Sequence, residues 1–502
     1  MYRADFVGRS RELEVLDSLW QSPKAMLLIL YGRRRVGKTR LLTHWLRRYP
    51  GQGLYWVAEP TSSLTQLRSF SQAIMSFMDP EIDIPADFSY ASWELALRQL
   101  ARYAQDKRIA LFIDEVTYLI DVDPEFVGML QKIWDHWLSD ANLMLVMSGS
   151  QMGIMRRHLL DYDAPLYGRA TAQMQLPPLP YGATAEFFPD YDAADRVALY
   201  AMWGGVPAYW ERLDADRPIM ENLRQIVLPA HSWMVDESRI LLSDFITDMH
   251  NYVGILRAIA DGQQTMGAIA KRTGLASGKA SFYLSVLRDT GFVAREVPMS
   301  HRDREDSRSG RYVVTDPYLR FFYRFISANQ SRLALGQIQP LLDQIEEELP
   351  AFIEANTWQE LCRQWLLLAG ARDAVPVAVD EVGSEWTGGQ SFDVVGIDTA
   401  GTGGAMTVLG DCFWDDHPVG PEALDTLARK ATHALPKRDD AENDAPQPVY
   451  LVAFAKGGWT DEAHEKAERI VNDAAGRRRW RPAGIRLLDL ATVDRDLAAW
   501  SV

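Results

Sequence analysis

Eight residues near the start of the chain have the types and the spacing that hold a phosphate group. The stretch 32–39, GRRRVGKT, fits the pattern G-x-x-x-x-G-K-[ST]. Its glycines let the backbone curl so that N–H groups point at phosphate oxygens, and the following helix adds its positive end. In this pattern Lys38 reaches the β- and γ-phosphates, and the Thr39 hydroxyl binds Mg²⁺. The candidate nucleotide contacts of the loop are Gly32, Arg33, Arg34, Arg35, Val36, Gly37, Lys38, Thr39 and Arg40.

The residues on either side place this loop between a strand and a helix. Residues 26–30 are all apolar, as in a buried strand, and apolar residues recur at helical spacing from 41 to 46. A chance glycine turn is the alternative, and the order strand, loop, helix disfavours it. The arginines at 33–35 occupy positions that need no particular side chain. Contact with phosphates, contact with another protein segment and exposure to solvent are all open to them.

A second apolar stretch ends in two carboxylates. Residues 109–113 predict a buried central strand, and Asp114 and Glu115 follow it directly. Asp114 is expected to hold the Mg²⁺ shell, and Glu115 is expected to polarise the attacking water. An apolar strand with an exposed acidic end is the alternative. The motif is weak alone, but it follows the loop at about the distance that a nucleotide-hydrolysing site requires.

A third apolar stretch, residues 143–147, predicts another strand of the same sheet. Ser148 and Ser150 follow it, and either could sense the γ-phosphate or be an ordinary turn serine. Together the three strands predict an α/β fold with a parallel sheet that binds ATP and Mg²⁺ and hydrolyses the ATP.

Four segments carry a resemblance to a known family. They are FVGRSREL at 6–13, DEVTYLI at 114–120, APLYGR at 164–169 and WGGVPAY at 203–209. In this order they resemble motifs of the prokaryotic "archaeal ATPase" family, a STAND and AAA+-related group of P-loop ATPases. The resemblance covers roughly residues 5–210.

The resemblance implies further roles at the nucleotide. The first segment lies near the adenine in this group, and the 203–209 turn belongs to a helical lid that reads the nucleotide state. Arg169 would be an arginine finger or phosphate sensor, and an arginine paired with a nearby carboxylate is the alternative. The implied nucleotide contacts outside the loop are Val7, Gly8, Arg9, Gly205 and Pro207.

Residues 251–316 predict a winged helix. Helices are expected at 252–260, 266–273 and 278–290, with Phe282, Val286 and Leu287 of the third helix as the candidates to point inward. Wing strands are expected at 292–297 and 311–315. The wing mixes basic and acidic residues: Arg295, Arg302, Arg304, Arg308, Arg311, Glu296, Asp303, Glu305 and Asp306.

A reader of the DNA groove normally shows a clearer basic face than this wing does. Winged helices of STAND-like ATPases often act as internal lids, and that role is favoured over DNA contact. The following segment, RYVVTDPYLRFF at 311–322, resembles the family's link to a C-terminal domain named DUF234.

The last part of the chain predicts a small α/β domain. A helix is expected at about 347–368, and strands are expected near 375–379, 392–397, 406–409, 450–454 and 485–488. The family's C-terminal domain resembles the PD-(D/E)xK nucleases, which need carboxylates for Mg²⁺ and a lysine beside the water or the scissile phosphate. Asp393 and Asp411 match the carboxylate positions.

The nuclease motif is damaged in this sequence. Phe413 stands at the lysine position, and phenylalanine can neither orient water nor support phosphate charge. Gln359 stands at the position of the helix glutamate, and Glu360 is about 100° further round the helix. Lys430 could substitute from the next helix, but no motif shows that it does. A nuclease-shaped fold used for binding is therefore favoured over an active nuclease.

Composition sets the outer limits. The chain has 502 residues, a net charge of −15 and two cysteines, Cys362 and Cys412, far apart in the sequence. No apolar run is long enough to span a bilayer, and no secretion signal precedes the first motif, so a cytoplasmic protein is expected. So acidic a chain is not a general nucleic-acid binder.

The expected domains are an ATPase core at 1–175, a helical lid at 176–245, a winged helix at 246–330 and a nuclease-like domain at 335–502. The favoured function is a STAND-like regulatory switch that binds and hydrolyses ATP and acts on a protein partner or on a second copy. An ATP-dependent, Mg²⁺-dependent DNA nuclease of a mobile-element or defence system is one alternative. A DNA-binding transcriptional regulator is the other.

Overall fold

The structure is a computed structural model that describes residues 6–243, 249–304, 307–387, 389–399, 406–434, 446–472 and 480–500. The chain forms two compact units. The first comprises Met1–Leu179, Val206–Glu211 and Arg239–Thr247, and the second comprises Pro180–Gly205, Arg212–Ser238 and Asp248–Val502. The expected domain boundary at 245–246 and the wing residues Glu305 and Asp306 lie outside the described residues.

A five-stranded parallel sheet forms the centre of the first unit, in the order β2-β3-β4-β1-β5. β3 and β4 are buried along their whole length. Both faces of a parallel sheet are covered, so its strands are near-continuous apolar runs, and the predicted α/β class is confirmed. The strands are β1 Met26–Tyr31, β2 Gly53–Val57, β3 Ile109–Asp114, β4 Leu143–Gly149 and β5 Ala172–Gln175.

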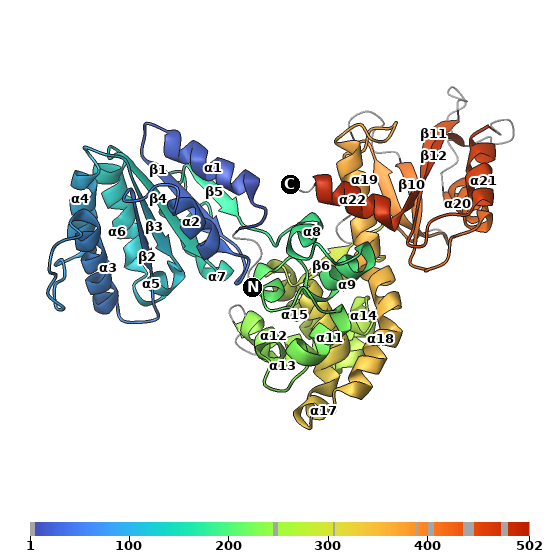
Figure 1. Cartoon of the computed structure of the whole chain (residues 1–502), viewed down its shortest axis with the longest axis horizontal. Helices are drawn as coiled ribbons and strands as arrows, with labels where there is room; N and C mark the ends of the chain where they lie inside the picture. The colour runs from blue at the N-terminus through green and yellow to red at the C-terminus, as the bar shows by residue number, and fades with distance from the viewer. Residues whose placement is uncertain are drawn as a thin grey trace. The chain divides into compact units, whose positions relative to one another are not determined.

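Helices cover both faces of this sheet (Figure 1). Successive residues of a strand point to opposite faces, so Leu28 of β1 packs with α1 and α2, while Leu27 packs on the opposite face with α3, α4 and α6. The bounds are α1 Ser10–Gln21, α2 Lys38–Leu46, α3 Ser63–Met78, α4 Trp93–Tyr103, α5 Thr117–Val122, α6 Glu125–Ile133, α7 Met152–Met155 and α10 Pro207–Trp210, with π-helical turns η1 Trp134–Leu138 and η2 Arg156–Leu160.

The second unit begins with short helices. They are η3 Tyr181–Ala183, α8 Thr184–Phe187, α9 Ala193–Trp203, α11 Ile219–Asn222, η4 Leu223–Val227 and α12 Trp233–Ser243, the last of which runs on into the first unit. Helix α9 ends at Gly204, whose φ of 55° and ψ of −158° suit only glycine. A Cβ there would lie 3.1 Å from Cγ of Pro317. The end of α9 is therefore closely packed against the segment that starts at Pro317.

Three helices and a hairpin follow at the positions where a winged helix is predicted. They are α13 Met249–Ala260, α14 Met266–Thr273, α15 Ser277–Asp289, β6 Val293–Glu296 and β7 Arg311–Val314, and they are called the winged-helix elements below. The prediction that Phe282 points inward is wrong, because its side chain is 63% exposed. Leu287 is buried as predicted, and Ala280 and Leu284 are buried with it. Phe282 lies about 200° round the helix from Ala280, on the opposite face.

A helical stretch leads from the winged-helix elements to the end of the chain. It contains α16 Pro317–Phe321, η6 Phe322–Ile326, η7 Ser327–Asn329, α17 Gln330–Ala334, α18 Gln339–Ile353, η8 Glu354–Trp358 and α19 Gln359–Gly370. α18, η8 and α19 follow one another without a break across the predicted helix. None of the helices in the described part of the chain is both long and apolar enough to cross a bilayer.

A mixed sheet forms the C-terminal domain, in the order β12-β11-β10-β9-β8. β10, β11 and β12 are parallel, β9 pairs antiparallel with β10, and β8 pairs antiparallel with β9. The strand predicted near 375–379 does not form; Pro376 lacks the N–H that a ladder needs, and the chain enters the sheet at Glu381. The strands are β8 Glu381–Glu385, β9 Phe392–Ile397, β10 Met406–Phe413, β11 Gln447–Ala455 and β12 Trp480–Asp489.

Helices α20 (Pro421–Ala434) and α21 (Asp461–Asn472) pack on one face of this sheet. α19 and α22 (Leu490–Trp500) lie on the other face, where Trp365 contacts both Phe454 of β11 and Trp500 of α22 (Figure 1). The core of the domain thus lies on both sides of β10 and β11.

Helix α22 is held to the start of the second unit by a buried carboxylate. Asp494 accepts hydrogen bonds from the Tyr181 hydroxyl at 2.6 Å and from Nε of Arg196 at 3.0 Å, and it also accepts from Nη2 of Arg196. Burial and the carboxylate of Asp494 raise the pKa of Tyr181 well above its ordinary value. The last helix of the chain and the start of α9 are therefore fixed to each other by charge.

We predict that Asp494→Asn lowers the stability of the second unit, because it leaves the buried guanidinium of Arg196 without its counter-charge. Breaking such a pair costs about 3–5 kcal/mol, and the two side chains are 14% and 11% exposed. Scanning calorimetry should show a lower transition temperature. Asp416→Asn is the matched control, since its pair with Lys456 is exposed and worth little. Equal shifts in the two variants would contradict the prediction.

Candidate functional site

The glycine loop is tightly curled at the end of β1. Gly37 has a φ of 97° and starts α2, and a Cβ on Gly32 would lie 2.5 Å from the carbonyl oxygen of Leu176. The ammonium of the buried Lys38 donates to the carbonyl oxygens of Gly32 and Arg33, at 3.1 Å each. The loop is therefore closed around its own lysine, as a phosphate cradle requires.

Asp114, at the end of β3, accepts hydrogen bonds from side chains of α2 and of the two neighbouring strands, β2 and β4. Its Oδ2 accepts from the hydroxyls of Thr39 and Tyr55, both at 2.6 Å. Its Oδ1 accepts from the Ser148 hydroxyl and from the Glu115 N–H at 3.0 Å. All these donors are neutral, and Asp114 is 1% exposed. Among the described contacts its charge thus meets no cation, which makes this carboxylate suited to a bound metal ion.

Tyr55 is the site residue that sequence reasoning missed. It lies on β2, which pairs with β3 so that Tyr55 is next to Phe112 and two residues from the strand end. Burial and the hydrogen bond to Asp114 raise its pKa well above the ordinary value. The signal was weak, because a tyrosine near a strand end forms no motif until the order of the strands is known.

Glu115 has an uncommon backbone conformation. Its φ is 51°, and Arg35 of the loop has a φ of 68°, both in the left-handed region. A non-glycine residue there costs about 1–3 kcal/mol and is often found at functional sites. The Ser150 hydroxyl donates to Oε2 of Glu115 at 2.9 Å. The two serines after β4 thus bind the two carboxylates after β3, Ser148 that of Asp114 and Ser150 that of Glu115.

The N-terminal motif reaches the glycine loop through Arg9. This buried guanidinium donates to the carbonyl oxygens of Val36 at 3.0 Å and Pro177 at 2.7 Å. Val7 is also buried, and a Cβ on Gly8 would lie 3.3 Å from a methyl group of Leu179. The structure therefore brings Val7, Gly8 and Arg9 to the loop and to the segment after β5.

Helix α10 packs on the same loop. Nη2 of Arg33 donates to the Tyr209 hydroxyl at 2.8 Å, and the Arg33 guanidinium lies 5.7 Å from the centre of the Tyr209 ring. Arg40 forms an ion pair with Glu211 just after α10. Loop arginines thus contact a protein segment, which is one of the options that the sequence left open.

The remaining residues that were predicted to contact the nucleotide belong to different units. A Cβ on Gly37 would lie 4.0 Å from Cγ of Pro207, so Pro207 is beside the loop. Gly205 belongs to the second unit, although it is separated from Pro207 by one residue. Nη2 of Arg34 donates to the Tyr118 hydroxyl of α5 at 3.2 Å.

Comparison with known families bears on this arrangement. Residues 6–213 match a family described as an ATPase domain predominantly from Archaea. This part of the chain is thus similar to that ATPase family. Residues 322–423 match DUF234, described as archaeal and bacterial proteins of unknown function. The family and the C-terminal domain predicted from the sequence are thus confirmed.

Relatives of this ATPase include an uncharacterized protein of Methanocaldococcus jannaschii, 26% identical over 392 residues, which are 78% of this chain and 84% of that protein. An uncharacterized ATP-binding protein of the same organism is 58% identical over 41 residues, 8% of this chain and 70% of that protein. Among solved structures, the Walker-type ATPase PABY2304 of Pyrococcus abyssi matches with a TM-score of 0.49 and 20% identity, over 64% of this chain and 96% of that one.

Arg169 is not brought to the phosphate loop. Its guanidinium makes two hydrogen bonds of 2.8 Å to the carboxylate of Asp135, which hold the pKa of Asp135 below its ordinary value. Thr171 donates to the carbonyl oxygen of Leu27, so Arg169 lies where β1 begins, whereas the loop follows the end of β1. Within one chain the structure has the paired arginine that was the alternative, because the parallel strands put the two segments at opposite edges.

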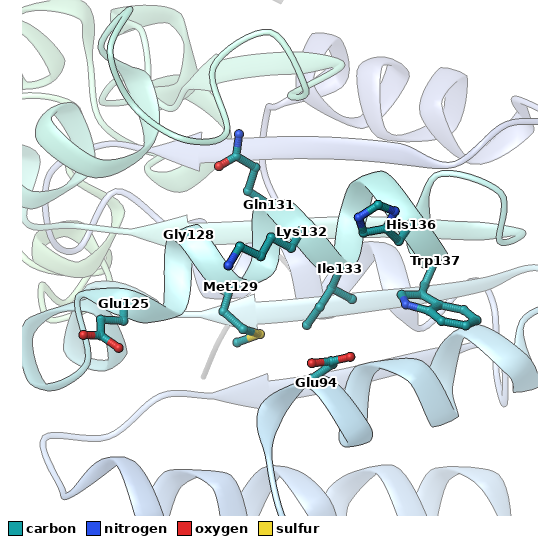
Figure 2. Close-up of a pocket in the computed structure, with 9 residues that line it drawn as sticks. All are labelled: Glu94, Glu125, Gly128, Met129, Gln131, Lys132, Ile133, His136 and Trp137. Carbon is teal, nitrogen blue, oxygen red and sulfur yellow. The ribbon is translucent and has the colours of Figure 1, made fainter.

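A separate cavity of about 620 Å³ lies between α4 and the helix formed by α6 and η1. Figure 2 shows Met129, Ile133 and Trp137 pointing from this helix toward α4, while Gln131 points away. None of its lining residues belongs to the glycine loop or follows a strand as Asp114 does. Its lining is Glu94, Glu125, Gly128, Met129, Gln131, Lys132, Ile133, His136 and Trp137.

The nuclease-like carboxylates lie together in the C-terminal domain. Oδ1 of Asp393 accepts from the Gln359 amide at 3.0 Å. Both oxygens of Asp411 accept from the ammonium of Lys430, at 2.6 and 2.7 Å. Burial raises the pKa of both carboxylates, and Lys430 opposes that rise. Lys430 was named in the sequence as a possible substitute, and the structure places it at the site.

The other residues of the motif point elsewhere. Glu360 forms an ion pair with Arg320 of α16 at 2.7 Å, so the helix acid is turned away from Asp393. The Phe413 ring lies against Trp459. In the described part of the chain, no three His, Cys, Asp or Glu side chains are arranged to hold a metal ion. The residues present therefore do not fit the Mg²⁺ that a nuclease would hold here.

Residues of the predicted wing contact the C-terminal domain. The Ser300 N–H donates to the buried Glu385 of β8 at 2.8 Å, and the Trp386 ring N–H donates to the Ser309 carbonyl oxygen at 2.9 Å. Burial raises the pKa of Glu385, but hydrogen bonds from Thr387 and Ser300 outweigh burial and hold this pKa below its ordinary value. Met299 is buried in the core of the C-terminal domain.

We predict that Tyr55→Phe weakens the response of ATP hydrolysis to Mg²⁺. The change removes one hydrogen bond that orients Asp114, and a hydrogen bond to a charged group is worth about 1.5–3 kcal/mol. The Mg²⁺ concentration for half-maximal hydrolysis should rise about tenfold. Tyr49→Phe is the control, since the Tyr49 hydroxyl makes only a 3.4 Å contact with Asp17, outside the site. An unchanged Mg²⁺ dependence in Tyr55→Phe would refute the role of Tyr55.

Proposed function

We propose that this chain is a STAND-like regulatory switch that binds and hydrolyses ATP and passes its nucleotide state to the second unit. The observation that carries the proposal is the packing of α10 against the glycine loop. Tyr209 and Glu211 contact Arg33 and Arg40, and the chain continues into the second unit on both sides of this short segment. A change at the loop therefore reaches the second unit through covalent connections.

The loop residues fit ATP and Mg²⁺ in their chemistry. Lys38 is placed to move from the loop carbonyls to the β- and γ-phosphates. Thr39 and Asp114 would hold Mg²⁺, which neutralises charge on the transferred phosphoryl group. Tyr55 and Ser148 orient the carboxylate of Asp114 from the strands on either side of β3. Val7, Gly8 and Arg9 support the loop and the adenine end of the nucleotide.

Glu115 would act as the base that orients the attacking water. In the described structure its carboxylate is bonded to Ser150, so that hydrogen bond holds it beside Asp114. Its left-handed backbone turns the side chain away from the strand direction at the cost of strain. Arg169 would serve as an arginine finger only toward the nucleotide of a second copy, after release from Asp135.

The second unit offers a path from α10 to the rest of the chain. Helix α9 leads into α10 through Gly204 and Gly205, and its other end is fixed to α22 through Arg196 and Asp494. α9 also packs against α16. In this proposal a movement of α10 would pass along the chain to α9, and from α9 to its partners α16 and α22.

The winged-helix elements act as a connector in this proposal. Ser300, Ser309 and Arg311 all contact the strand β8 or Trp386 just after it. These groups lie in or beside the wing that would approach a DNA backbone. A DNA-binding regulator, the alternative, would first have to separate the wing from the C-terminal domain. No observation favours that alternative over the connector.

Hydrolysis itself gives the first test. We expect Lys38→Ala to lose ATP binding and hydrolysis, and Glu115→Gln to lose hydrolysis while still binding ATP. Mg²⁺-dependent phosphate release and binding of a fluorescent ATP analogue measure the two steps. The molar mass of Glu115→Gln with ATP, from light scattering, then shows whether the ATP state self-associates. Wild-type protein that neither binds nor hydrolyses ATP would overturn the proposal.

The coupling has its own test. We predict that Tyr209→Phe, which removes the hydroxyl that Arg33 contacts, retains ATP binding but weakens the ATP-induced change of hydrogen exchange in α9 and α16. Tyr118→Phe is the matched control, because it also loses an arginine–hydroxyl contact but lies on α5, where the chain on both sides belongs to the first unit. The same exchange response in Tyr209→Phe and wild type would show that α10 does not carry the signal.

A further inference from the structure

Two carboxylates face one another on neighbouring strands of the C-terminal sheet. The antiparallel pairing of Gly410 with Val394 sets Asp411 beside Asp393. The Cys412 N–H donates to Oδ2 of Asp393 at 3.0 Å, which fixes that side chain against β10. Asp411 is 7% exposed. Like charges opposite one another on paired strands repel, and burial makes the repulsion stronger, so a positive charge beside this pair stabilises its ionised form.

Lys430 supplies that charge from α20. Its ammonium lies 2.6 and 2.7 Å from the two oxygens of Asp411, and the side chains of Lys430 and Asp411 are 15% and 10% exposed. The same ammonium lies 4.9 Å from the centre of the Phe392 ring, within the range of a cation–π contact. One cation from the protein itself thus uses both oxygens of Asp411.

A divalent cation would need the same oxygens. Mg²⁺ binds oxygen ligands at about 2.0–2.1 Å in near-octahedral geometry, so an ion on Asp411 would lie where the ammonium lies. Displacing Lys430 would leave a buried ammonium without a partner, which is unfavourable. Oδ1 of Asp393 is already bonded to Gln359, and Glu360 is paired with Arg320. No acidic side chain of α19 is therefore directed at the pair.

We infer that Lys430 is a built-in counter-ion that takes the place of a divalent cation between the strands β9 and β10 and the helix α20. The C-terminal domain then binds no Mg²⁺ at Asp393 and Asp411, and it contributes to the protein by binding and not by metal-dependent hydrolysis. This inference concerns the second unit alone and does not depend on ATP. Its failure and the failure of the proposed switch are therefore separable.

The test is to remove the ammonium and to titrate the full-length, nucleotide-free protein with Mn²⁺, following bound ion by electron paramagnetic resonance. Lys430→Met should bind one Mn²⁺ per chain more than wild type. Its thermal transition should fall without Mn²⁺ and recover with it. The double variant Lys430→Met with Asp411→Asn should bind no more than wild type. Any Mn²⁺ held by Thr39 and Asp114 is common to all three proteins and cancels in the comparison.

Three outcomes would overturn the inference. One is wild-type protein that binds one Mn²⁺ more than the neutral double variant, a comparison that decides even if Lys430→Met does not fold. Another is a folded Lys430→Met that gains no Mn²⁺. The third is Mg²⁺-dependent cleavage of plasmid DNA by wild type that Lys430→Met lacks, since Lys430 would then serve the scissile phosphate.

Discussion

The contact between α10 and the glycine loop is the constraint on which the proposed switch depends. Tyr209 and Glu211 take the arginines at 33 and 40 as partners, and the chain on both sides of this segment belongs to the second unit. The chain enters and leaves the α10 segment from the second unit. If α10 moves with the glycine loop, it must therefore move the second unit or strain the two connecting segments. Gly204, whose backbone conformation suits only glycine, lies in the connection between α9 and α10.

The buried carboxylates of Asp114, Asp411 and Asp494 have two different surroundings. Asp114 is held by neutral hydroxyls and an N–H, so its charge stays available to an ion that binds and leaves with the nucleotide. Asp411 and Asp494 instead have a lysine and an arginine against them. A carboxylate neutralised in this way holds two structural elements together, because breaking the ion pair would leave a buried charge without a partner. In the proposed function, the same type of side chain would thus hold a metal ion in the first unit and join structural elements in the second.

The sequence predicts those features whose parts are close in the chain. The glycine loop needs only consecutive residues, so its position between β1 and α2 followed from a short pattern. Tyr55 became visible only in the fold, because its role depends on β2 lying next to β3. Lys430 was named from the sequence as a possible substitute, but its contact with Asp411 could not be predicted without knowing that α20 lies over β10. Arg169 shows the opposite failure: its motif was recognised, but the parallel sheet places it at the edge away from the loop. Phe282 was assigned to the wrong face because three smaller residues fill the core side of α15.

The contacts that the wing makes with the C-terminal domain also favour the connector role on energetic grounds. Met299 is buried in the C-terminal core, and the carboxylate of Glu385 is buried with the Ser300 N–H as one of its donors. Pulling the wing away would expose an apolar side chain and remove a hydrogen bond from a buried charge, and both changes are unfavourable. Arg311, which a DNA-binding wing could offer to phosphates, stacks on Trp386 instead. In the proposed switch, the winged-helix elements and the C-terminal domain would therefore respond together to a movement of α10.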